Sequence, residues 1–135
     1  MLQLTRALWL EMIAHAYDGL PDEACGLLVG ELATGSVKAF HPCRNAAASS
    51  RIYEIDGRDY LRVDREADGR GLDIVGVMHS HTHTEAYPSP TDVGQAVDPS
   101  WHYIIVSLKR AEPALRSFRI ADGKIEEETV TVGPG

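Results

Sequence analysis

The stretch LDIVGVMHSH, residues 72–81, is an apolar run that ends in two histidines. A short apolar run bounded by glycine predicts a strand that is covered on both faces. The stretch EACGLLVG, residues 23–30, has the same character. We therefore expect these two strands to lie in a buried sheet, with a glutamate at the entrance to one and histidines at the end of the other.

The residues before the stretch 23–30 predict a helix. Thr5 offers a capping hydroxyl, and Gly19 and Pro21 provide the end. Between them, apolar residues recur at the three-four spacing of one helix face: Leu8, Trp9, Met12, Ile13, Ala16 and Tyr17.

Two more helices are expected. One covers residues 56–68, with Asp56 or Asp59 near its start and with Tyr60, Leu61 and Val63 turned inward. The other begins at Ser89 and Pro90 and continues to about Val97, because a capping hydroxyl, a proline and an early acid are typical of a helix start.

The remaining periodic segments predict strands. Asp122 and Gly123 favour a hairpin turn between the last two of these. The expected strands cover residues 2–4, 37–43, 51–56, 101–108, 114–120 and 124–132. Helices interleaved with such strands indicate an α/β or α+β layered sheet, and a chain of 135 residues has the size of a single domain, residues 1–135.

The composition excludes several classes of protein. A content of 44% hydrophobic and 24% charged residues is typical of a soluble globular chain, and the net charge of −7 disfavours nucleic acids and anionic membranes as partners. No apolar run approaches the roughly 20 residues of a membrane span, and the N-terminus does not resemble a signal peptide. We expect a cytoplasmic protein in which Cys25 and Cys43 are thiols.

His79 and His81 are candidate metal ligands. Residues two apart on a strand face the same way, about 6.6 Å apart, so both imidazoles can reach one ion. Asp92 would supply the third protein ligand of a catalytic zinc and leave one position for water. If the strand continued, His83 and Glu85 would face the same way as His79 and His81 and would also be candidate ligands. The turn-like segment after His81 is expected to end the strand before them.

Simpler interpretations of the helix start stay open. Asp92 is also an ordinary first-turn acid, and Ser89 an ordinary cap, although a hydroxyl beside a metal can also stabilise an oxyanion. Bound zinc would activate water and polarise a carbonyl, and a nearby carboxylate would then carry the proton. Glu23, Glu54 and Glu85 are the acids to consider for that task.

The spacing is His-X-His, seven residues, Ser, two residues, Asp, and it resembles the JAMM (MPN+) metalloprotease family. The signatures of zinc deaminases and of His-Glu-X-X-His proteases are absent. The resemblance implies a cytidine-deaminase-like central mixed β-sheet flanked by helices. It also implies that Glu23 is the general base and acid, that Ser89 polarises the scissile carbonyl, and that zinc is bound by His79, His81 and Asp92.

Within the family, the chain is similar to the small bacterial Mec-type enzymes. This likeness implies release of cysteine from the Gly-Gly tail of a ubiquitin-like sulfur carrier, CysO or a similar protein. Thr82 departs from the proline of many relatives, which concerns loop shape, and the chain is short for the insertions of eukaryotic deubiquitinating members. Imidazole and carboxylate ligands suit zinc and do not exclude iron or manganese.

Other functions remain as alternatives. A broader JAMM protease would remove such a modifier from protein lysines, and a scaffold would keep the fold without catalysis. A metal sensor or store would recruit His83 and Glu85 as extra ligands. Cys25 could be a fourth ligand or an inhibitory thiol, although burial as a small apolar residue is the simpler account. The oligomeric state is not determined by these patterns.

Overall fold

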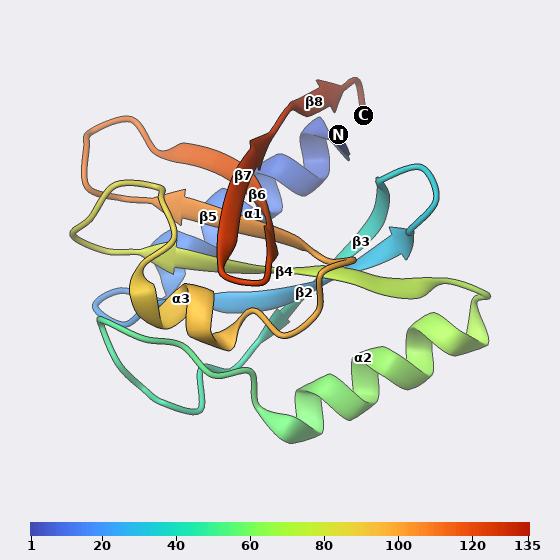
Figure 1. Ribbon diagram of the computed structural model, residues 1–135, viewed down its shortest axis with the longest axis horizontal. Coiled ribbons are helices and arrows are strands. Elements are labelled where there is room, and N and C mark those ends of the chain that lie inside the picture. The colour runs from blue at the N-terminus through green and yellow to red at the C-terminus, as the bar shows by residue number, and fades with distance from the viewer.

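The computed structural model describes residues 1–135, whose strands join in one eight-stranded sheet of order β7-β6-β5-β4-β2-β3-β1-β8 (Figure 1). Eight strands and three helices follow one another along the chain: β1 (Leu2–Thr5), α1 (Arg6–Asp18), β2 (Cys25–Glu31), β3 (Ser36–Cys43), α2 (Gly57–Gly69), β4 (Asp73–His81), α3 (Pro90–Gln95), β5 (His102–Ser107), β6 (Ala114–Ala121), β7 (Lys124–Glu128) and β8 (Val130–Gly133). None of the helices is long and apolar enough to span a membrane.

The sheet is mixed, as expected for the α/β layered class. β4 pairs with β2 in antiparallel fashion and with β5 in parallel fashion, and β1 is parallel to both of its neighbours. β4 is buried from its second residue to its last, and β2 from its first to its sixth. The two apolar runs thus form adjacent central strands, as the sequence predicted.

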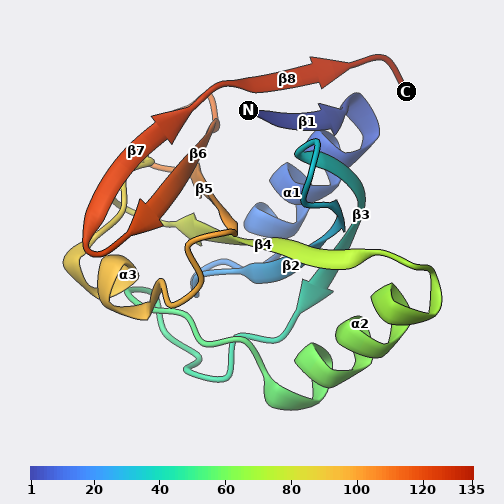
Figure 2. The same cartoon turned by 45° about the vertical axis from the view of Figure 1, so that its right-hand side comes forward.

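The helices cover opposite faces of the sheet, so that the core has two halves (Figure 2). Alternate residues of each strand point to different halves. Leu28 of β2 and Met78 of β4 lie on the α1 side, whereas Leu27 and Val77 lie on the α2 side.

The first two helices begin at the predicted caps but bury narrower stripes than expected. Thr5 accepts a hydrogen bond from the Leu8 backbone at 3.2 Å, and α1 buries Leu8, Met12, Ile13 and Ala16. Tyr17 is 43% exposed, contrary to prediction, because at about 100° per residue it lies beyond Ile13, past the edge of the buried stripe and opposite Leu8.

The inward face of α2 was also predicted incorrectly in part. Val63 and Ala67 are its buried residues, whereas Tyr60 is 38% exposed and Leu61 is 55% exposed. Leu61 is two positions from Val63 and therefore lies on nearly the opposite side of the helix.

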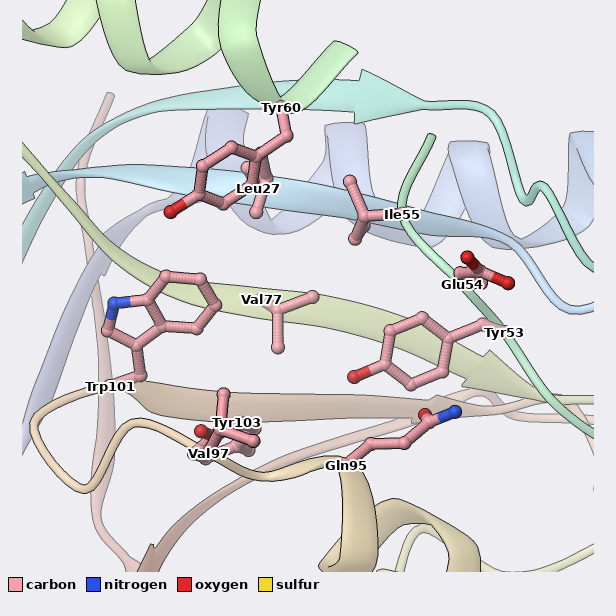
Figure 3. A pocket seen from close by; sticks show the side chains of 10 residues that line it. All are labelled: Leu27, Tyr53, Glu54, Ile55, Tyr60, Val77, Gln95, Val97, Trp101 and Tyr103. Carbon is pink, nitrogen blue, oxygen red and sulfur yellow. The ribbon is translucent and has the colours of Figure 1, made fainter. Parts of the chain in front are cut away.

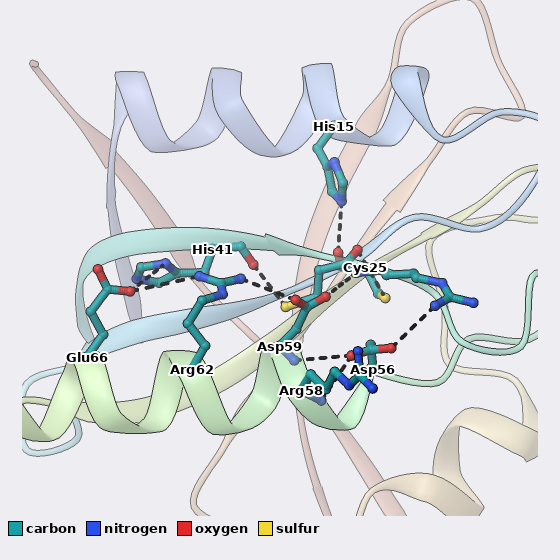
Figure 4. Close-up of polar contacts among 10 residues, drawn as sticks. His15, Cys25, His41, Asp56, Arg58, Asp59, Arg62 and Glu66 are labelled. Atoms are coloured by element: carbon teal, nitrogen blue, oxygen red, sulfur yellow. Dashed lines mark hydrogen bonds and ion pairs between the residues drawn. The ribbon is translucent and has the colours of Figure 1, made fainter.

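Polar contacts hold α2 against the end of β3 (Figure 4). Asp56 caps the helix, and its Oδ2 lies 3.7 Å from Nη1 of Arg44. The backbone N–H of Arg44 donates a hydrogen bond to Asp59 Oδ2 at 2.8 Å. Farther along, Glu66 lies 3.7 Å from His41 of β3. These contacts hold α2 against the end of β3 and the residue that follows it.

Residues 51–56 do not form the predicted strand. Their only ladder contact is an isolated bridge between Asn45 and Ile55. The Asn45 side chain instead organises this loop: its oxygen accepts from Ala47 and Glu54, and its amide donates to the carbonyls of Glu23 and Ile52. A side chain that bonds so many backbone groups replaces the ladder that a strand would need.

The predicted strand over residues 124–132 is divided in two. β7 pairs with β6 through the predicted turn, in which Asp122 and Gly123 both have positive φ, whereas β8 pairs with β1 at the other edge of the sheet (Figure 2). Only Thr129 separates the two strands. The sheet must therefore curl until its outer strands approach, which no local pattern encodes.

Candidate active site

The two histidines lie at the carboxyl end of β4, in contact with the start of α3 through Asp92. His79 is 2% exposed and His81 is 4% exposed. β4 ends at His81, as predicted, and the following residues form bends, with His83 and Glu85 exposed. Neither His83 nor Glu85 belongs to the group of side chains that converges here.

Asp92 is brought to the histidines by the start of α3. Ser89 caps this helix: its hydroxyl accepts from the Asp92 backbone at 3.1 Å, and its own N–H donates to Asp92 Oδ2 at 2.9 Å. The same Oδ2 lies 2.9 Å from His81 Nε2 and 3.2 Å from His79 Nε2. The structure thus brings three of the predicted residues together, and their ligand atoms lie within 4.8 Å of one another.

The proton positions at this site favour a cation between the three groups. His81 Nδ1 lies 2.8 Å from the Glu85 carbonyl oxygen, which can only accept, so Nδ1 carries the proton. In the neutral ring, Nε2 then presents a lone pair to His79 Nε2, at 3.2 Å, and to the Asp92 carboxylate. Lone pairs that face one another need a proton or a metal ion between them, and two imidazoles with one carboxylate form a donor set suited to zinc.

The electrostatics keep Asp92 ionised. Burial raises its pKa, but hydrogen bonds with His79 and His81 and from the Ser89 backbone hold that pKa well below its ordinary value. Burial lowers the pKa of His79, despite the hydrogen bond to Asp92. Burial lowers the pKa of His81, but hydrogen bonds with Asp92 and the Glu85 carbonyl raise it above its ordinary value. Asp92 and His79 thus have the protonation states that metal binding requires, and binding would release a proton from His81.

Glu23 lies beside this group without joining it. It is 4% exposed, and its Oε1 has no hydrogen-bond partner. Burial raises the pKa of its carboxyl to about 7; the charge of His81 lowers it and that of Asp92 raises it. A buried carboxyl with a free oxygen and a pKa near neutrality can both take up and release a proton.

Backbone contacts position Glu23 from two sides. Its N–H donates to the Ser49 carbonyl at 2.8 Å, and its carbonyl accepts from the Asn45 side chain at 3.0 Å. Ser80 lies between the two histidines in the sequence, and its hydroxyl accepts from Ala24 N at 2.8 Å while its own N–H donates to the Ala24 carbonyl at 2.9 Å. Ser80 thus ties the histidine strand to the segment that carries Glu23.

Tyr53 is a residue of the site that was not predicted from the sequence. Its ring stacks on that of His79, with centroids 4.2 Å apart and planes inclined by 17°. The segment RIYEID was interpreted only as a strand, and nothing in its pattern indicates a partner 26 positions away. Tyr53 limits the orientations available to the His79 ring, whose Nδ1 has no hydrogen-bond partner.

An apolar cavity of about 400 Å³ lies alongside the histidine strand (Figure 3). Its floor includes Val77, two residues before His79 on the same strand, and Tyr53 joins the cavity to the histidines. Its ten lining residues are mostly hydrophobic: Leu27, Tyr53, Glu54, Ile55, Tyr60, Val77, Gln95, Val97, Trp101 and Tyr103.

The cysteines are free thiols, as predicted, and both are buried. Burial, reinforced by nearby charges, raises the pKa of Cys25 to about 12 and that of Cys43 to about 11. Cys25 pairs in register with His79, but its sulfur points to the Cys43 carbonyl and is not among the converging ligand atoms.

Comparisons of sequence identify relatives for most of the chain. Residues 5–121 match the Prok-JAB model, described as prokaryotic homologs of the JAB domain. A CysO-cysteine peptidase of Mycobacterium tuberculosis is 43% identical over 122 residues, which are 90% of this chain and 84% of the relative. A desampylase of Haloferax volcanii is 36% identical over 101 residues, or 71% of this chain and 73% of the relative.

Solved structures agree with the predicted fold. A protein from Desulfitobacterium hafniense superposes with a TM-score of 0.91 at 35% identity, covering 100% of this chain and 94% of that one. A JAB1/MPN domain protein from Archaeoglobus fulgidus gives a TM-score of 0.67 at 21% identity, covering 98% and 99% of the two chains. The expectation of a JAMM/MPN-type mixed sheet flanked by helices is confirmed.

Proposed function

Because this chain belongs to the Prok-JAB family of prokaryotic JAB-domain homologs, we propose that it is a zinc-dependent peptidase that cleaves after the C-terminal glycine of a ubiquitin-like carrier protein. One observation carries the proposal. Two imidazoles and an ionised carboxylate meet at one point, and a buried glutamate with an unpartnered oxygen lies beside them. The whole chain would act as a single JAMM domain in the cytoplasm.

Each residue has a distinct role in this proposal. His79, His81 and Asp92 would hold the zinc ion, which would supply Lewis acidity and lower the pKa of a water molecule. Glu23 accepts the proton of the attacking water and delivers it to the leaving amine, since its pKa of about 7 suits both steps. Ser89 stabilises the charge that develops on the scissile carbonyl oxygen.

The substrate we propose is a carrier tail that ends in Gly-Gly and bears cysteine, as in CysO. The name of the mycobacterial relative supports this choice. The apolar cavity next to His79 suits the tail residues that precede the glycines, because its floor continues the strand that carries the ligands. Glycines at the cleavage point suit a narrow approach to a buried centre, since they have no side chains to accommodate.

The substrate assignment can be tested at the rim of the cavity. Val97 is 86% exposed, so Val97→Ser should leave stability unchanged. If the tail covers this residue, KM should rise about tenfold, which corresponds to about 1.4 kcal/mol of lost contact. Leu32→Ser, at an exposed residue outside the cavity, is the matched control. Equal KM values for both variants would remove the cavity from substrate binding.

The alternative activity is removal of a ubiquitin-like modifier from protein lysines, and the desampylase relative supports it. Mass spectrometry of reactions with carrier-cysteine and carrier-lysine conjugates would rank the two substrates. A faster reaction with the lysine conjugate would favour the alternative. The exposure of His83 and Glu85 argues against a closed metal store, because neither side chain points to the centre.

A further inference from the structure

The orientation of His81 depends on a loop outside its own strand. Its Nδ1 donates to the carbonyl of Glu85 at 2.8 Å, and this bond leaves Nε2 free to bind a metal ion. Glu85 belongs to residues 82–88, a segment without helix or strand. Interactions other than the hydrogen bonds of a β-sheet must therefore hold the Glu85 carbonyl in place.

Ser107, the last residue of β5, supplies one such tie. It pairs in register with His81 on the neighbouring parallel strand, so both side chains point to the same face of the sheet. Ser107 is 3% exposed, and its hydroxyl donates to the Thr84 carbonyl at 2.6 Å. Beside it, the Leu108 N–H donates to the His81 carbonyl at 3.0 Å.

Arg110 supplies a second tie from the same end of β5. Its guanidinium donates to Glu85 Oε1 from Nη2 at 2.9 Å and from Nε at 3.2 Å, and Lys109 Nζ lies 3.4 Å from the same oxygen. The residue whose carbonyl orients His81 is therefore held by its side chain as well.

We infer that Ser107 is a positioning residue for the metal centre, acting through the 82–85 loop on the His81 ring, and that Arg110 supports the same loop. This inference rests on the metal site proposed above. Ser107 touches neither the metal ligands' donor atoms nor the substrate in this role. Its effect should appear in the affinity for metal, because partners of a ligand's second nitrogen fix the ring and its tautomer.

The experiment measures zinc affinity of the metal-free protein by competition with a chromophoric chelator. Ser107→Ala should weaken zinc binding by about 10 to 100-fold. Ser117→Ala is the matched control: Ser117 is also a buried serine on the sheet, but its hydroxyl donates to Glu128, away from the site. The control should lose stability and keep wild-type affinity. Wild-type affinity in a folded Ser107→Ala protein, or an equal loss in both variants, overturns the inference.

A second pair of variants covers the case in which Ser107→Ala fails to fold. Arg110→Met should weaken zinc binding, and Arg116→Met should not, although Arg116 makes a comparable surface pair with Glu127. Nitrogen NMR of the zinc-loaded protein should show that the His81 Nδ1 proton exchanges faster in Arg110→Met than in wild type, and at the wild-type rate in Arg116→Met. Unchanged affinity and exchange would overturn the role of Arg110. If the wild-type protein itself binds no zinc, the proposed function fails first.

Discussion

Replacing Glu23 by glutamine should make the protein more stable and almost inactive at once. The carboxyl is 4% exposed, and burial raises its pKa from an ordinary 4.5 to about 7. An acid with a raised pKa in the folded state binds more protons folded than unfolded, so it destabilises the fold progressively as pH rises from 4.5 to 7. At about 1.36 kcal/mol for each pKa unit, the cost at pH 8 is about 3 kcal/mol.

The assay is urea unfolding of the metal-free protein at pH 5 and pH 8. Glu23→Gln should exceed wild type in unfolding free energy by up to about 3 kcal/mol more at pH 8 than at pH 5, because glutamine carries no charge to bury. Glu54→Gln, an exposed acid at the cavity, should show no such difference. The same advantage at both pH values would refute the burial argument.

The zinc-loaded Glu23→Gln protein should keep its metal and lose turnover by about 10² to 10⁴-fold, the usual contribution of a group that transfers protons. Near-normal turnover in a variant with full metal content would remove Glu23 from its role. A gain in stability together with a loss of activity is expected where a buried charge serves function and not folding.

Three further substitutions separate the remaining roles. His81→Ala should lose the metal, because two protein ligands remain, and elemental analysis of the purified variant checks this; one equivalent of retained zinc would contradict the ligand set. Ser89→Ala removes a cap worth about 1 kcal/mol, so a lower melting temperature with intact turnover would support the cap alone, and the reverse an oxyanion role. Glu128→Gln tests the junction of β7 and β8: burial raises the Glu128 pKa, but hydrogen bonds from His102 and Ser117 lower it to about 2. Its charge therefore stabilises the fold by up to about 3 kcal/mol above pH 4.5, and urea unfolding should show this advantage over the variant disappearing as pH falls towards 2, whereas a constant difference would contradict it.

The elements closest to the histidines followed from local patterns. β4 and β2 were predicted because uninterrupted apolar runs require cover on both faces. The start of α3 was predicted from the capping hydroxyl of Ser89, the proline after it and the early acid Asp92. In the structure, Ser89 and Asp92 satisfy each other's backbone groups. In contrast, residues 51–56 were predicted as a strand, yet Asn45 binds their backbone in a loop.

What the sequence alone determined is the row of ligands, since a period of two places His79 and His81 on one face of any strand, and the helix-start chemistry that presents Asp92. Tertiary structure decided the rest. The pairing of β2 with β4 places Glu23 beside the histidines, although 56 positions separate Glu23 from His79. The hydrogen bond from the Ala24 N–H to the Ser80 hydroxyl joins the two segments. The curl of the sheet sends β8 to the far edge, and β5 brings Ser107 beside His81. Local periodicity reports which face a residue occupies, but which strands become neighbours depends on how the whole chain closes its core.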